Sequence, residues 1–130
     1  MSFWQAKTKI NSLDKLFSEY VRRRDGECQY RVKCYGKQEW KTLHNSHYFG
    51  RAKKSVRYNP ENCDAACPAC HMFVHENPKW LDEWKEKQLG TQRFALLTLR
   101  ANTPSKIDET MMKIVVKQML KNLDSLEGDR

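Results

Sequence analysis

The stretch "ENCDAACPACHMFVH", Glu61–His75, carries most of the information about the architecture of this chain. It contains two cysteines separated by two residues, a histidine directly after them, and a second histidine four residues later. Proline is tolerated in the first turn of a helix, so Pro68 predicts a helix start that follows a short strand or turn at Cys63–Ala66. On that helix, residues four apart lie on one face. The stretch therefore predicts a strand and a helix that gather metal ligands.

The cysteines of the chain favour zinc over disulfide bonds. Their number is odd, five, and no export signal is evident. The Cys67-Pro-Ala-Cys70 turn at a helix N-terminus is a good thiolate site, because free backbone N–H groups stabilise negative sulfur. With Cys28 and Cys34 it could supply four thiolates to one structural zinc, which leaves Cys63 spare and buried. The alternative is that the cysteines are small buried hydrophobic residues.

Segments on both sides of this unit complete an α+β pattern. Apolar residues at helical spacing predict an N-terminal helix over about 11–24, ended by Gly26. The following residues, Cys28 to about Tyr48, are aromatic and turn-rich, which predicts two short strands. Asn77-Pro78 predicts the start of another helix, which ends at Gly90.

The C-terminal part is predicted to be mainly helical. Phe94–Leu99 fits a helix or a strand, and Lys106–Leu123 is amphipathic. The predicted apolar face of this last helix contains Ile107, Met111, Ile114, Val115, Met119 (or Gln118) and Leu123.

The composition indicates a soluble protein with a polyanionic partner. The 130 residues include 24 Lys and Arg against 16 Asp and Glu, which gives a net charge of +8 and a pI near 9.3. Basic side chains that neutralise phosphates release counterions, so nucleic acid is the expected partner. No apolar run approaches the roughly 20 residues that span a bilayer, and no signal peptide is evident. We therefore expect no membrane partner and a cytoplasmic location.

Three further residues give the chain a resemblance to a nuclease family. His47 follows the first predicted strands, Asn62 opens the second apolar stretch, and His71 follows the cysteine pair. This His…Asn…Cys-x2-Cys-His pattern resembles the HNH nucleases of the ββα-metal, or His-Me finger, class. The strings "LDKLFSEYVRRRDGEC" and "HYFGRAKKSVRYNPENCDAACPACHMFVHENP" more closely resemble the phage NinG/Rap recombination proteins, over roughly residues 13–90.

The resemblance implies a fold and a set of roles. The fold is a ββα-metal (HNH) core over about 26–78 with a structural zinc knuckle. Helices over about 11–24 and 79–124 flank it in a single domain, 1–130. The resemblance makes His47 the general base that activates water and His71 a ligand of a catalytic divalent ion. It makes Asn62 either a brace for the loop that carries His47 or a group that touches the metal.

One departure from the family pattern concerns the metal. Many HNH enzymes have an acid or a histidine directly before the base, where this chain has Ser46. His75 is the best candidate to complete the ligand set with His71, and His44 is a poorer one because strand alternation points it away from His47. Imidazoles would accept Mn²⁺, Ni²⁺ or Zn²⁺ as well as Mg²⁺. The alternative is that His47 and His71 are structural histidines of the zinc knuckle.

A basic loop lies between the predicted base and Asn62, where it would flank a phosphate. Its proposed DNA-binding residues are Arg51, Lys53, Lys54 and Arg57.

These features predict a metal-dependent HNH-type DNA endonuclease that leaves a 5′ phosphate and a 3′ hydroxyl. The resemblance adds a phage origin, the cytosol of a bacterial host, and branched recombination intermediates as substrate. We expect recognition of DNA shape without strict sequence specificity. Phage or host recombination proteins and a second copy of the chain are further candidate partners. The alternatives are a non-catalytic zinc-containing DNA-binding module in recombination or packaging, and an RNA-binding zinc knuckle.

Overall fold

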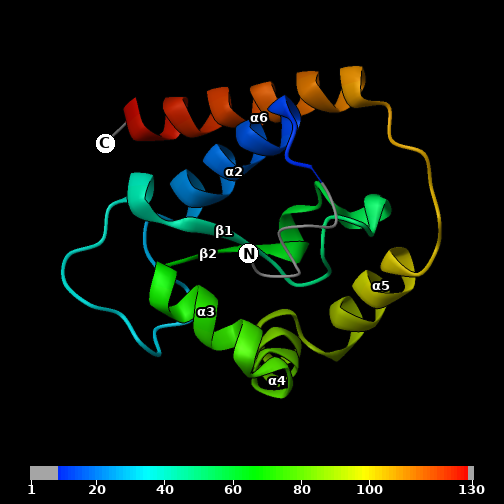
Figure 1. Cartoon of the computed structure of the whole chain (residues 1–130). Coiled ribbons are helices and arrows are strands. Elements are labelled where there is room, and N and C mark those ends of the chain that lie inside the picture. The colour runs from blue at the N-terminus through cyan, green and yellow to red at the C-terminus, as the bar shows by residue number, and fades with distance from the viewer. Residues whose placement is uncertain (1–8, 129–130) are drawn as a thin grey trace.

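The computed structural model describes residues 9–128 and places a small sheet among helices (Figure 1). This arrangement confirms the α+β class. The strands are β1 (His44–His47) and β2 (Cys63–Ala66), and short 3-10 turns lie at η1 (Trp40–Thr42), η2 (Lys54–Val56) and η3 (Pro60–Asn62). The helices in this part of the chain are α2 (Ser12–Asp25), α3 (Pro68–Glu76), α4 (Pro78–Leu89), α5 (Thr91–Ala101) and α6 (Glu109–Gly128).

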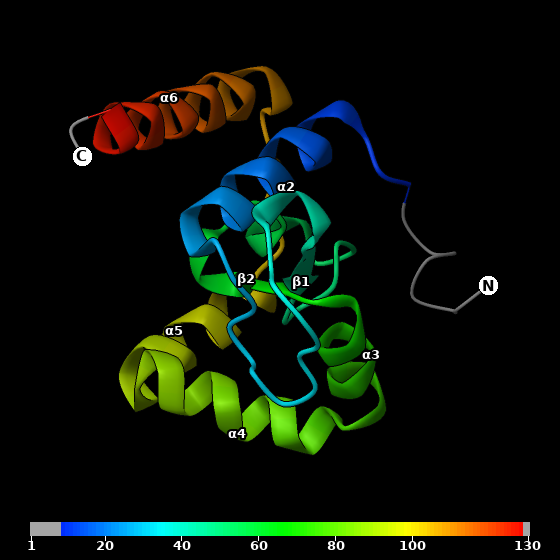
Figure 2. The ribbon, with the colours of Figure 1, turned by 90° about the vertical axis from the view of Figure 1, so that its left-hand side faces the viewer.

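The sheet lies between two groups of helices. Figures 1 and 2 show α2 and α6 on one side of the strands and α3, α4 and α5 on the other. On α2, the side chains of Leu13, Phe17 and Val21 recur every four residues and are buried against the sheet and α6. All four residues of β2 are buried, so β2 is the centre of the core.

The two strands pair in antiparallel orientation with a definite register. His44 lies opposite Ala66, and His47 lies opposite Cys63. Because β2 leads directly into α3, this register puts the first residue of β1 beside the start of that helix.

The prediction of two strands between Cys28 and Tyr48 is wrong for most of that stretch. Only β1 forms there, and residues 27–39 contain neither helix nor strand. The backbone has positive φ at Gly26 (71°), Arg31 (58°) and Gly36 (68°), and such angles interrupt a pleated strand. The segment is a loop shaped by its cysteines.

The ambiguous stretch Phe94–Leu99 is helical, as part of α5. The apolar face predicted for the last helix is only partly buried: Ile107, Met119 and Leu123 are half-buried. The buried residues of α6 are Val116 and Leu120, whereas Met111, Ile114 and Val115 are exposed. Because α6 packs mainly along α2, only part of its surface is covered. No helix in the described residues is long and apolar enough to cross a membrane.

A buried polar cluster that the sequence did not reveal joins β2 to α4. The Lys85 ammonium, in a residue only 1% exposed, donates to Asp64 Oδ2 at 2.7 Å. Gln88 donates to the other oxygen of the same carboxylate at 2.6 Å. A charged pair taken out of water in this way is satisfied only in one arrangement, so it fixes α4 against the sheet.

Candidate functional site

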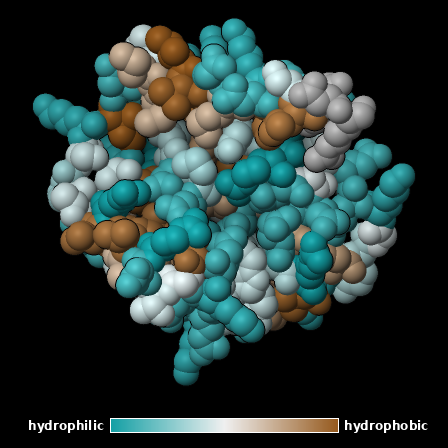
Figure 3. All heavy atoms as spheres, turned by 180° about the vertical axis from the view of Figure 1, so that it is seen from behind, coloured by the Kyte–Doolittle hydropathy of each residue, from teal (hydrophilic) through white to brown (hydrophobic). Residues whose placement is uncertain are grey.

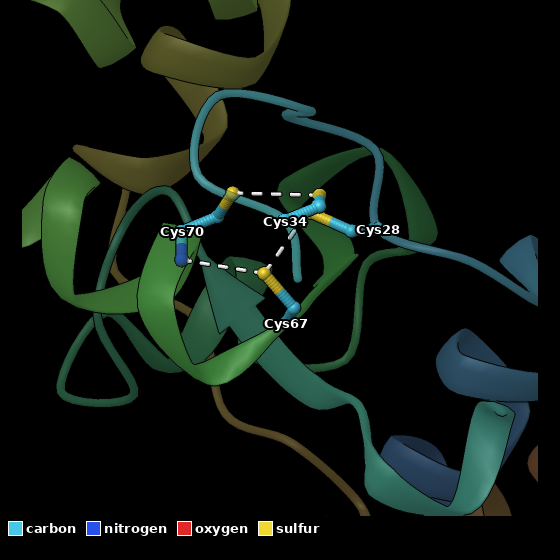
Figure 4. Close-up of side chains that lie close together, drawn as sticks. All are labelled: Cys28, Cys34, Cys67 and Cys70. Atoms are coloured by element: carbon cyan, nitrogen blue, oxygen red, sulfur yellow. Dashed lines mark hydrogen bonds between the residues drawn. The ribbon is translucent and has the colours of Figure 1, made fainter. Parts of the chain in front are cut away.

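Four cysteines converge at the start of α3 (Figure 4). Cys28 and Cys34 come from the loop after α2, Cys67 caps α3, and Cys70 lies in its first turn. Their sulfur atoms all lie within 4.8 Å of one another, with Cys34 Sγ 3.8 Å from Cys70 Sγ and 3.9 Å from Cys67 Sγ. Four sulfurs at about 2.3 Å from one tetrahedral zinc are about 3.8 Å apart. The cluster therefore fits a zinc ion.

Backbone donors around the cluster favour thiolates. Lys33 N–H donates to Cys70 Sγ at 3.1 Å, and Cys70 N–H donates to Cys67 Sγ at 3.4 Å. Burial opposes ionisation of Cys70, but backbone hydrogen bonds outweigh it, so the pKa of this thiol is lowered. Burial raises the pKa of Cys67 to about 12. A zinc ion held here would displace the thiol protons and, with four protein ligands, would leave no position for water.

His47 is held in the tautomer that a general base needs. Its Nε2 lies 3.2 Å from the backbone carbonyl oxygen of Arg57. A carbonyl only accepts hydrogen bonds, so Nε2 carries the proton and Nδ1 keeps its lone pair. Burial lowers the pKa of His47 to about 4, so the imidazole is neutral at pH 7.

Asn62 has the geometry of a brace for the loop that follows His47. It is fully buried, and its Oδ1 accepts from Phe49 N–H at 2.8 Å. Its Nδ2 donates to the carbonyls of Phe49 at 2.9 Å and Val56 at 3.1 Å. These bonds occupy the side-chain amide with backbone groups, which matches the bracing role and leaves no free donor for a metal-bound group.

His44 and His71 meet at the edge of α3. Their Nδ1 atoms are 3.0 Å apart, although alternation along β1 made His44 the poorer candidate. The two histidines meet because the strand register pairs His44 with Ala66, and Ala66 directly precedes Cys67, the residue that caps α3. The His75 ring lies 5.0 Å from the His71 ring, between centroids. Burial above all, and then the neighbouring histidines including His47, lowers the pKa of His71 to about 3.

The Ser46 hydroxyl is hydrogen-bonded to the cysteine loop and not to a histidine. Ser46 is 2% exposed, and its Oγ is 2.8 Å from the hydroxyl of Tyr30 in the cysteine loop. Ser46 therefore joins β1 to that loop.

The four predicted DNA-binding residues of the basic loop differ in exposure. Lys53 and Lys54 are exposed, and Arg51 is half-buried. Arg57 is a correction, because it is 7% exposed and its Nε donates to Asp14 Oδ1 at 2.9 Å. A guanidinium committed to a buried carboxylate on α2 is not available to a phosphate.

Comparison with known proteins identifies one family. The family model described as "Bacteriophage Lambda NinG protein" matches residues 4–128. No curated protein and no solved structure matches the chain. Since the family match extends over nearly all of the 130 residues, the chain belongs to the bacteriophage lambda NinG family.

Proposed function

We propose that the protein is a metal-dependent DNA endonuclease of the HNH type that acts on branched recombination intermediates. The observation that carries the proposal is the state of His47: a neutral imidazole whose Nε2 is bound to a backbone carbonyl and whose Nδ1 is a free lone pair. The order β1, β2, α3, with β1 and β2 paired and the cysteine cluster at the start of α3, supports a ββα-metal core. Membership of a phage family supports a role in phage DNA metabolism.

In the proposed reaction, His47 Nδ1 accepts a proton from a water molecule as the water oxygen bonds to phosphorus. The bond between phosphorus and the 3′ oxygen breaks, and the leaving oxygen takes up a proton from solvent. The products are a 5′ phosphate and a 3′ hydroxyl. Asn62 keeps the loop after His47 in place through its three backbone hydrogen bonds.

The proposed divalent ion is Mg²⁺ or Mn²⁺, with Ni²⁺ or Zn²⁺ as substitutes, held by His71 and His75 on one face of α3. Such an ion would stabilise negative charge on the scissile phosphate and on the departing oxygen. The neutral state of His71 suits it to this role, because a protonated imidazole cannot bind a metal.

The loop that follows His47 carries Arg51, Lys53 and Lys54, and these side chains would contact the DNA backbone. Backbone contacts position DNA without reading its sequence, which agrees with a substrate chosen by shape.

The test is cleavage of plasmid and of synthetic four-way junctions in the presence of Mn²⁺, by wild type and by His47→Ala. The wild type should cut, and loss of the base should lower the rate by about 100-fold or more. Because the pKa of His47 is near 4, the wild-type activity should persist down to about pH 5, below the range of an ordinary histidine.

Zinc content and near-ultraviolet circular dichroism show whether the variant keeps its fold. Equal cleavage by both proteins means that a contaminating nuclease is at work, and the proposal is then discarded. A wild type that binds junctions without cutting them points to the non-catalytic DNA-binding module.

A further inference from the structure

The position before the base holds Ser46, which bonds to Tyr30, so the ligand that many HNH enzymes have there is missing. We propose that His44, three residues before the base, takes its place and binds the divalent ion together with His71 through the two Nδ1 atoms. The use of this ion in catalysis rests on the proposed function, whereas the binding itself does not.

The separation of the two nitrogens fits a shared ion. Two nitrogens at about 2.1 Å from one ion and about 90° apart are about 3.0 Å from each other. The Nδ1 atoms of His44 and His71 are 3.0 Å apart. The rings meet edge to face, with an interplanar angle of 76°, so they do not stack.

Both histidines are held by the same rigid frame. His44 is fixed by the β1–β2 register opposite Ala66. His71 follows Cys70 directly, and its N–H donates to Cys67 O at 2.9 Å. The cysteine cluster therefore positions His71. Strand β2, which leads into the cluster, positions His44 by pairing with β1.

The pair is open to solvent on one side. His44 is exposed and His71 is half-buried. An ion bound by His44 and His71, with His75 as a third imidazole on the same face of α3, keeps coordination positions for water or phosphate oxygens, which a catalytic ion requires.

The experiment measures Ni²⁺ binding to the untagged, zinc-loaded protein by isothermal titration calorimetry. Ni²⁺ is chosen because imidazole suits it. The wild type should bind one Ni²⁺, and His44→Ala and His71→Ala should each weaken binding by about tenfold or more, with the zinc content unchanged. Met72→Ala is the matched control, because this exposed residue is the neighbour of His71 and is not a proposed ligand.

His44→Gln, which keeps the size of the side chain better, is tested with His44→Ala, and circular dichroism checks the fold of both. Nickel affinity within twofold of the wild type in either variant overturns the inference, even if the wild type cuts DNA and His47→Ala does not. Conversely, nickel binding that requires His44 in a protein that never cuts DNA upholds the inference and removes the proposed function.

Discussion

The chemistry open to each histidine depends on the partner of one ring nitrogen. The backbone carbonyl of Arg57 fixes the proton of His47 on Nε2, which leaves Nδ1 to accept a proton. His71 Nδ1 forms a hydrogen bond with His44 Nδ1, so one of the two carries a proton, and loss of that proton to the other ring nitrogen lets both Nδ1 lone pairs bind one ion. Residues of the same type are therefore suited to different roles in one protein.

Arg57 is expected to matter for stability and not for DNA binding. It makes two hydrogen bonds to Asp14, at 2.9 Å and 2.5 Å, and both side chains are buried. Arg57→Met leaves a buried carboxylate without its partner, which should lower the free energy of unfolding by about 3–5 kcal/mol. Urea denaturation measures the loss.

The control for this variant is Lys54→Met on the exposed part of the same loop, which should change the free energy of unfolding by less than about 0.5 kcal/mol. If Arg57→Met keeps full stability but binds DNA more weakly, the guanidinium belongs to the DNA surface after all.

At the scale of elements, the cysteine loop over residues 27–39 contains neither helix nor strand. Its shape depends on Cys28 and Cys34 and on Tyr30, whose ring packs against Trp84 with centroids 4.6 Å apart. The loop thereby links the cluster to α4 as well as to α3. Without a metal, the four cysteines of the cluster would be thiols that no covalent bond holds together.

Loss of zinc should therefore destabilise the protein, and a comparison of two cysteines can show it. Cys34→Ser removes a proposed ligand, whereas Cys63→Ala changes a buried cysteine of β2 outside the cluster. A structural zinc contributes folding free energy directly, so Cys34→Ser should lower stability by at least about 3 kcal/mol. This corresponds to a decrease of about 10 °C in Tm.

Elemental analysis should find zinc in wild type and in Cys63→Ala but not in Cys34→Ser. Treatment of the wild type with a chelator should reproduce the lower Tm. Zinc retained by Cys34→Ser, with an unchanged Tm, would contradict the four-cysteine site.

The sequence predicted well those elements whose ends are set by residues within one turn. Asn11 and Gly26 cap α2, and Pro68 and Pro78 begin α3 and α4, because caps and prolines act within a turn. The cysteine loop was missed because its form depends on ligands distant in sequence. The His44–His71 contact was missed because it depends on the register between β1 and β2, which alternation along one strand does not determine. The buried face of α6 depends likewise on where α2 lies.

For the whole molecule, the net charge of +8 overstates the basic surface that is available to the proposed DNA substrate. The basic run at the end of α2 is largely used within the fold. Arg24 donates to the backbone carbonyls of Pro60 at 3.0 Å and Cys63 at 2.8 Å, and Arg23 pairs with Glu19 and Asp124. Hydrophilic side chains are spread widely over the face in Figure 3, so hydropathy does not single out a binding surface there. The better guide to the proposed DNA surface is that Lys53 and Lys54 are exposed on the loop that follows His47.

The salt dependence of DNA binding can separate local contacts from overall charge. Each phosphate contact that is lost flattens the plot of log Kobs against log salt concentration by about 0.9. Replacing both Lys53 and Lys54 by Ala should therefore reduce the slope by about 2, as measured by fluorescence anisotropy with a four-way junction at several salt concentrations. The matched control replaces Lys117 and Lys121, two exposed lysines of α6, which Figure 1 shows on the opposite side of α2 from α3. This control removes the same charge and should leave the slope nearly unchanged. An equal decrease in both double variants would mean that the loop after His47 makes no special contact and that the protein holds DNA through its net charge.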